Sequence, residues 1–220
     1  MSDITKLLIF GEVLFDCFPT GERILGGAPF NVAWHLQAFG DSPHLISRVG
    51  DDALGKKILS TMESWGLSLS GIQIDPVHQT GRVDVKFVHE EPHYTITPDS
   101  AYDFIDASTI DRECDSGILY HGTLGLRNDV SRNALSELTR GSRLSVFLDV
   151  NLRAPWWEKE EVYQWIKKAR WVKLNEDELS QLGGDNGATE TTAHAFMQAH
   201  ALTGLVVTLG ARGAVALTAD

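Results

Sequence analysis

Two groups of polar side chains stand at the ends of apolar runs that have the composition of buried strands. Asp16 follows the first run, while Asp149, Asn151 and Arg153 alternate at the end of a later one. Ligands of open α/β sheets bind at the carboxyl ends of the strands. The guanidinium of Arg153 is suited to hold a phosphate or a carboxylate, because it binds such groups bidentately. The alternative for Asp149 and Arg153 is an ordinary ion pair on the surface.

A glycine pair precedes a predicted helix. Residues 26–31 read Gly-Gly-Ala-Pro-Phe-Asn, and the glycines would let the backbone approach a ligand closely. Pro29 suits the first turn of a helix, where its missing N–H is not needed. Asn31 and the helix amides would then face whatever lies above Gly26 and Gly27. Taken alone, however, the segment is better explained by an ordinary helix-entry turn.

Asn175 and Glu178 stand three residues apart at the start of another predicted helix, so their side chains can share one face. A carboxylate and an amide there could hold water bound to Mg²⁺ near nucleotide phosphates. Helix capping by Asn175, with acidic residues in the first turn, is the stronger interpretation of this segment alone.

Thr208, Gly210 and Gly213 belong to a strand, a glycine-bounded turn and a second strand. Such glycines would let a nucleotide lie against the backbone. The alternative is a hairpin with glycine turns and no ligand.

Residues 50–57, Gly-Asp-Asp-Ala-Leu-Gly-Lys-Lys, nearly match the phosphate-binding P-loop. The hydroxyl that would bind Mg²⁺ is missing, because Lys57 takes its place, and two acidic residues would repel phosphate. We therefore interpret the segment as a turn in which Asp51 or Asp52 caps the helix that follows.

The elements that must position these residues follow from hydrophobic periodicity. Strands are expected at 7–10, 45–50, 117–121, 144–150, 171–174, 205–209 and 214–218, and helices at 28–39, 54–65, 129–140, 155–170, 176–182 and 189–200. Alternating strands and helices favour an α/β fold with a mostly parallel sheet flanked by helices. Residues 82–87 differ, because polar and apolar side chains alternate there with period two. A turn at 90–92 and a returning segment at 93–97 follow, which predicts a small β flap.

The composition narrows the class of protein. The chain has 220 residues, with 19 Lys and Arg against 30 Asp and Glu, for a net charge of −11. This balance argues against partners such as nucleic acid or an anionic membrane, which need clustered cations. Only Cys17 and Cys114 are present, and no apolar stretch approaches the roughly 20 residues of a membrane span. We therefore expect a cytoplasmic protein.

Taken in order along the chain, these segments resemble the ribokinase-like carbohydrate kinases of the PfkB family, and in particular its fructokinase-like members. The matching segments, which cover essentially the whole chain, are GEVLFDCFP, GGAPFNVAWHLQAFG, RVGDDALGKK, DVNLRAPWW, KLNEDEL and VTLGARGA. Each is weak alone, but six in register are specific. The resemblance implies a ribokinase-like α/β domain over residues 1–220, with a β lid inserted at about 80–97.

The resemblance also implies an activity and a set of site residues. The activity is transfer of the γ-phosphoryl group of ATP, with Mg²⁺, to a hydroxyl of fructose or a similar monosaccharide. The implied sugar-binding residues are Asp16, Gly26, Gly27, Asn31 and Arg153, and Arg153 would also contact the transferring phosphate. The implied nucleotide-binding residues are Asn175, Glu178, Thr208, Gly210 and Gly213, with Glu178 reaching Mg²⁺ through water. Because the lid often pairs between subunits in relatives, a homodimer through the lid is expected.

One family signature does not occur in the 220 residues. It has the form D-T-x-G-A-G-D, and in the family its last Asp is the general base on the sugar hydroxyl. The catalytic base is therefore unknown here, and the chain is expected to be the N-terminal portion of a kinase, C-terminally truncated and with little activity alone. Two alternatives stay open: a non-catalytic sugar-binding protein, and a nucleoside kinase of the same superfamily, since Asp16 and Asn31 suit ribose as well as sugar hydroxyls.

Overall fold

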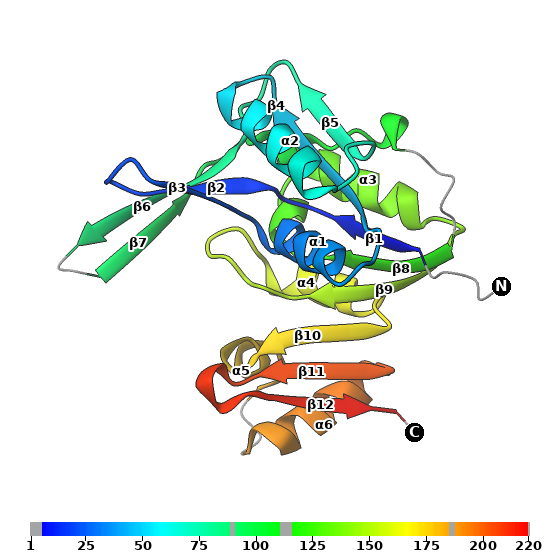
Figure 1. Cartoon of the computed structure of the whole chain (residues 1–220). Helices are drawn as coiled ribbons and strands as arrows, with labels where there is room; N and C mark the ends of the chain where they lie inside the picture. Colours follow the sequence, from blue (N-terminus) through cyan, green and yellow to red (C-terminus); the bar gives the residue numbers. More distant parts are fainter. Residues whose placement is uncertain (1–5, 89–90, 111–115, 185–187, 220) are drawn as a thin grey trace.

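The computed structural model describes residues 6–88, 91–110, 116–184 and 188–219, and their strands form two sheets (Figure 1). The large sheet has, in spatial order, β12 (Ala214–Thr218), β11 (Gly204–Thr208), β10 (Trp171–Asn175), β9 (Arg143–Asp149), β8 (Ser116–His121), β1 (Leu7–Phe10), β4 (His44–Gly50) and β5 (Ile72–Asp75). Neighbouring strands are parallel except for β12, which pairs antiparallel with β11. The predicted α/β fold is therefore confirmed.

Helices cover both faces of the large sheet. They are α1 (Ala28–Ala38), α2 (Ala53–Trp65), α3 (Asp129–Thr139), α4 (Lys159–Ile166), α5 (Glu176–Gly183) and α6 (Thr189–Ala199). The central strand β1 shows the two faces, because its side chains alternate between them. Leu8 and Phe10 belong to a core that includes side chains of α3, α4, α5 and α6. Ile9 belongs to a separate core that includes side chains of α1 and α2.

The smaller sheet, called the lid below, projects from the body (Figure 1). Its spatial order is β3 (Arg23–Gly26), β2 (Leu14–Cys17), β6 (Gly81–Val88) and β7 (Glu91–Ile96). Strands β6 and β7 fall within the predicted flap. Strands β2 and β3 were not expected, so Asp16 lies inside a lid strand and not in a connection after the first strand. Each of these strands has only four residues, too few to show a clear periodicity.

Two elements of the large sheet and its helices also differ from the sequence prediction. Strand β5 was not expected, although it pairs along β4 at the edge of the large sheet. Helix α4 begins at Lys159, four residues later than predicted, and ends at Ile166, four residues earlier than predicted. The preceding residues make a turn instead, in which the Trp156 N–H donates to the Arg153 carbonyl at 2.7 Å. Pro155 thus lies before the helix and not in its first turn.

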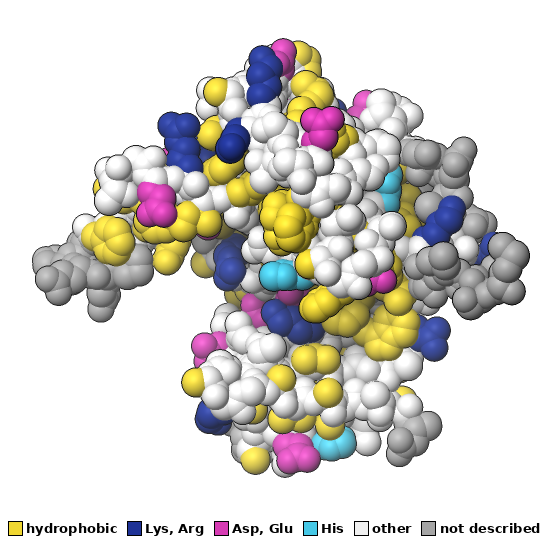
Figure 2. Space-filling model, viewed as in Figure 1, with side chains coloured by type: hydrophobic (Ala, Val, Ile, Leu, Met, Phe, Trp, Pro, Cys, Tyr) yellow, Lys and Arg dark blue, Asp and Glu magenta, His cyan; other side chains and the backbone are white. Residues whose placement is uncertain are grey.

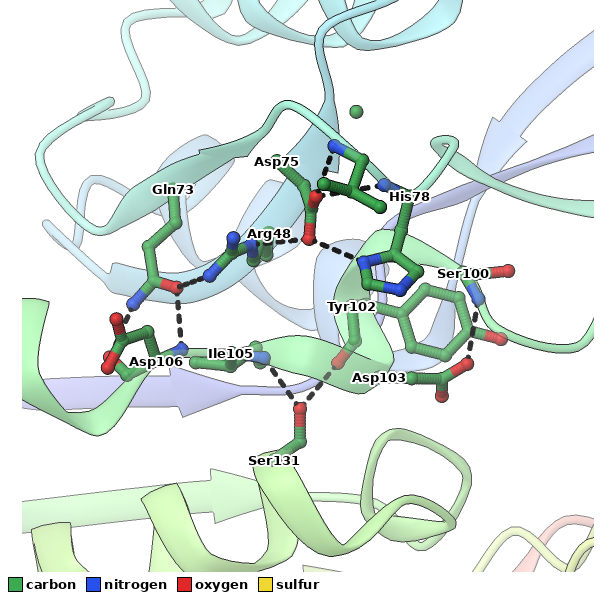
Figure 3. Close-up of polar contacts among 12 residues, drawn as sticks. Arg48, Gln73, Asp75, His78, Ser100, Tyr102, Asp103, Ile105, Asp106 and Ser131 are labelled. Carbon is green, nitrogen blue, oxygen red and sulfur yellow. Dashed lines mark hydrogen bonds and ion pairs between the residues drawn. The ribbon is translucent and has the colours of Figure 1, made fainter.

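Buried polar contacts anchor the root of the lid, where the chain passes from β5 to β6 (Figure 3). The Asp75 carboxylate accepts hydrogen bonds from the backbone N–H of Val77 and His78, both at 2.8 Å, and its Oδ2 lies 2.8 Å from Arg48 Nε. The Thr80 N–H donates to Asp52 Oδ2 at 2.8 Å. The entry to β6 is therefore fixed to the body. At the exit, β7 leads into the short helix η1 (Ala101–Phe104), whose Ala101 N–H donates to the Gln79 carbonyl at 2.8 Å.

The segment that resembles a P-loop is a helix cap. Asp52 is the N-cap of α2, and its Oδ1 accepts a hydrogen bond from the Gly55 N–H at 2.8 Å. The capping interpretation is confirmed. Elsewhere, no helix in the described part of the chain is long and apolar enough to cross a bilayer.

Candidate active site

A cavity of about 490 Å³ lies between the lid and the body, a size typical of small-molecule sites. Its wall combines lid strands with the carboxyl ends of β9 and β10 and the start of α1. The lining residues are Glu12, Leu14, Asp16, Gly27, Ala28, Asn31, Val83, Tyr94, Ile96, Leu124, Asp149, Asn151, Arg153 and Lys173. Four predicted sugar-binding residues, Asp16, Gly27, Asn31 and Arg153, are thus brought together. The fifth, Gly26, adjoins them, since a Cβ there would lie 3.7 Å from Asp16 Oδ2.

Gly27 allows the start of α1 to approach the residues after β1. Its φ is +106°, and a Cβ added to it would lie 2.6 Å from the carbonyl oxygen of Glu12. Only glycine fits such a position, both for its backbone angle and for its close approach. Asn31, one turn into the helix, is thereby placed at the cavity.

Asp16 and Arg153 reach the cavity from different elements, the lid strand β2 and the segment after β9. Burial raises the pKa of the Asp16 carboxyl above its usual range, although the charge of Arg153 acts in the opposite direction. The guanidinium of Arg153 is exposed, and it donates only to the neighbouring Leu152 carbonyl, at 3.3 Å, among the described contacts. It is therefore available to an anionic group of a ligand.

A second set of polar groups at the cavity centres on Asp149. Its carboxylate accepts a hydrogen bond from the Tyr120 hydroxyl at 2.9 Å and pairs with Lys173 Nζ at 2.9 Å. Lys173 is opposite Asp149 in the register between β9 and β10. Sequence reasoning did not select Lys173, because this pair joins residues that are far apart in the chain. Asp149 and Asn151 were noted beside Arg153, but no role was given to them.

Glu12 was also missed. It is only 1% exposed, and its Oε2 has no hydrogen-bond partner among the described residues. Burial raises the pKa of the Glu12 carboxyl to about 7, while the backbone N–H groups of Glu12 and Ala28 and the charge of Arg153 oppose the rise. A sequence signal did exist, since a lone carboxylate directly after a buried strand needs a partner.

The predicted nucleotide-binding residues lie next to each other at the ends of β10 and β11. Asn175 and Thr208 are register partners, and the short helix η4 (Gly210–Arg212) follows. Gly210 and Gly213 have φ of +60° and +89°, and a Cβ at either would meet no atom within 4 Å. Both glycines therefore face open space at the surface. These residues do not line the cavity described above.

Glu178 has a structural role at this place. Asn175 and Glu178 form a capping box at the start of α5, which confirms the capping interpretation. Glu178 Oε2 accepts from the Asn175 N–H at 2.9 Å, and Oε1 accepts from the Leu152 N–H at 2.7 Å. Glu178 therefore ties helix α5 to the segment that carries Arg153. Both oxygens are already engaged, so a contact with Mg²⁺ through water fits this residue better than direct coordination.

The lid has hydrophobic side chains on its surface, which are seen along the projecting strands in Figure 2. Val83 and Val85 are 7% and 3% exposed, whereas Phe87 and Tyr94 are 57% and 63% exposed. Tyr94 also lines the cavity.

Comparisons with known proteins agree with this geometry. The model of the pfkB family of carbohydrate kinases matches residues 10–220. The chain is 26% identical, over 94% of its own length and 70% of the relative's, to "Probable fructokinase-4" of Arabidopsis thaliana. It is 30% identical, over 78% of its length, to "Putative sugar kinase PH1459" of Pyrococcus horikoshii, and spans only 62% of that relative.

A solved structure agrees as well. It is the fructokinase of Vibrio cholerae O395 in its fructose-, ADP- and calcium-bound form, with a TM-score of 0.84 at 26% identity. The match covers 97% of this chain and 73% of that one. A family match over nearly the whole chain, together with the shared fold, leads to one conclusion: the chain belongs to the PfkB family of carbohydrate kinases.

Proposed function

We propose that this chain carries the sugar site and part of the nucleotide site of an ATP-dependent kinase for fructose or a similar monosaccharide. The observation that carries the proposal is the meeting of Asp16, Asn31 and Arg153 in one lidded cavity. A carboxylate and an amide bind sugar hydroxyls, and a guanidinium stabilises a transferring phosphoryl group. The Vibrio cholerae relative, which binds fructose and ADP, supports this choice of substrate and nucleotide.

The nucleotide is proposed to lie along the turn at Gly210 and Gly213, beside Asn175 and Thr208. When bound, Mg²⁺ would neutralise charge on the phosphates during phosphoryl transfer. Glu178 would reach it only through water, because its oxygens hold the backbone N–H groups of Leu152 and Asn175. Arg153, which lines the sugar cavity, would orient the sugar that accepts the phosphoryl group.

The activity of these 220 residues is tested by release of ADP from ATP, Mg²⁺ and fructose. The residues contain no G-A-G-D segment, so no family base is available. We expect turnover at least ~10²-fold below that of a chain continued by a family segment that contains this signature, since a general base contributes on this scale. Full turnover by the 220 residues would contradict this expectation and place a base among them. Turnover that stays absent in the continued chain would favour the non-catalytic sugar-binding alternative.

The acceptor is tested on the same continued chain with a panel of sugars and nucleosides. Fructose is expected to be the better acceptor. Preferred phosphorylation of a nucleoside would favour the nucleoside kinase alternative.

A further inference from the structure

The Glu12 carboxyl lies in the wall of the sugar cavity without a role in the proposal so far. Its side chain is almost fully buried, and Oε2 has no hydrogen-bond partner among the described residues. Buried polar groups in proteins are nearly always hydrogen-bonded, because an unpartnered one costs free energy. An unpartnered carboxyl oxygen on a residue in the wall of a cavity therefore points to a donor supplied by a ligand.

The packing around Glu12 leaves the cavity as the direction of approach. The start of α1 lies against its backbone at Gly27, and its Ala28 N–H interacts with the carboxyl group. On another side is the short helix η3 (Leu124–Leu126), where a Cβ on Gly125 would lie 3.3 Å from Glu12 Oε2. Backbone thus closes these sides. Oε2 is itself shielded from solvent, and the cavity that Glu12 lines is the side left for a hydrogen-bond donor.

The charges around Glu12 set its protonation. The groups that share the cavity with it or act on it are Asp16 from β2, Tyr94 from β7, Tyr102 from η1, Tyr120 from β8, Asp149 from β9, Arg153 after β9, and Lys173 from β10. Helix α1 contributes backbone and the uncharged Asn31 side chain to the cavity, and η3 contributes backbone and apolar groups. Burial raises the pKa of Glu12 to about 7, with Asp149 adding to the rise and Arg153 opposing it. Without bound sugar, the Glu12 carboxyl is therefore protonated in a large fraction of molecules at neutral pH.

We propose that the Glu12 carboxylate accepts a hydrogen bond from a hydroxyl of the bound monosaccharide, and that sugar binding consequently releases a proton from this residue. A hydroxyl donating to an ionised carboxylate makes a stronger bond than one to a neutral acid. Bound sugar thus favours the ionised form, and by linkage higher pH favours the bound sugar. The inference rests on the proposed function, because it assumes that the cavity binds a sugar.

Isothermal titration of the 220-residue chain with fructose at pH 6, 7 and 8 tests this inference. With a free-site pKa of about 7, the dissociation constant should be about tenfold larger at pH 6 than at pH 8. Titrations at pH 7 in buffers of different ionisation enthalpy should show release of about half a proton per sugar bound. The Glu12→Gln variant should lose both effects and bind at least about tenfold more weakly at pH 8.

Two further variants control the experiment. Glu63→Gln replaces an exposed carboxyl on α2, and it should keep the affinity and the pH dependence of the original chain. Glu12→Asp keeps a carboxyl with a shorter reach, and it should bind more weakly while still releasing a proton. It also covers the case in which Glu12→Gln fails to fold.

The outcomes separate this inference from the function on which it rests. If the original chain binds no fructose at any pH, the proposed function fails and the inference falls with it. If the chain binds fructose but Glu12→Gln has the same affinity and proton release, only the inference is overturned. An affinity of the original chain that does not change between pH 6 and pH 8 would also overturn it.

Discussion

Gly27 shows how much of the site depends on one residue without a side chain. It brings α1 against Glu12. Its φ is +106°, and a Cβ added to it would lie only 2.6 Å from the carbonyl oxygen of Glu12. We expect Gly27→Ala to lower the free energy of unfolding by about 3 kcal/mol, because it adds a steric clash to a strained backbone. Chemical denaturation measures this change, and fructose affinity should fall with it.

The control for this prediction is Gly40→Ala. Gly40 also has a positive φ, +90°, but a Cβ there would meet no atom within 4 Å. Its substitution should therefore cost only the backbone strain, roughly 1–2 kcal/mol. Equal losses in the two variants would contradict the close approach at Gly27.

The sequence could predict those binding residues that stand in a short local motif. Asp16, Asn31 and Arg153 each stand in a short run that indicates a strand end or a helix start, and they do line one cavity. Lys173 could not be found in this way, because its partner Asp149 reaches it only through the register of β9 and β10. Their roles in binding stay predictions.

Among the elements, the return from the lid depends on one buried ion pair. Arg127 donates to Asp103 through Nε and Nη2, at 2.8 and 2.7 Å, and to the Thr97 carbonyl at 2.7 Å. The two side chains are 5% and 2% exposed. We expect Arg127→Met to lower the free energy of unfolding by about 3 kcal/mol, because it leaves the Asp103 charge buried without its partner.

Denaturation of Lys56→Met provides the comparison. Lys56 pairs with Asp51 at 3.1 Å, but both side chains are more than half exposed. An exposed pair contributes little, so this variant should unfold like the original chain. A similar loss in both variants would show that burial of the Arg127 pair is not what holds the lid root.

The elements also show where sequence patterns stop being informative. Helix α2 was predicted to within a residue, because Asp52 caps its start and Gly66, with φ of +80°, ends it. Helix α4 was predicted too long, because the turn at Trp156 depends on a contact with a residue outside the helix. The Trp156 ring lies under Arg127, whose Cζ is 4.5 Å from the ring centroid. Strands β2 and β3 become visible only through pairing in the folded chain: β3 pairs with β2, and β2 pairs with β6.

At the scale of the whole molecule, we propose that two copies associate through their lids. Phe87 is 57% exposed on β6, and an exposed apolar side chain on a projecting sheet favours a partner surface. Phe87→Asp should shift the chain toward monomers in light scattering at micromolar concentration. Lys86→Asp, at the neighbouring position on the opposite face of the strand, is the matched control. Val85 is unsuitable for this test, because it is only 3% exposed and its substitution would affect folding.

A monomeric original chain would exclude this assembly. A dimer that Phe87→Asp leaves unchanged would place the contact elsewhere on the surface.

Fructose titration of the original chain and of Asp16→Ala decides whether the cavity beneath the lid is a monosaccharide site. Asp16 is half-buried at the cavity wall and makes no ion pair among the described contacts, so its loss should weaken binding without a large change in melting temperature. We expect one fructose bound per chain at pH 8, with affinity at least about tenfold lower in Asp16→Ala. Saturable binding that is equal in both proteins, or no binding to the original chain, would contradict it.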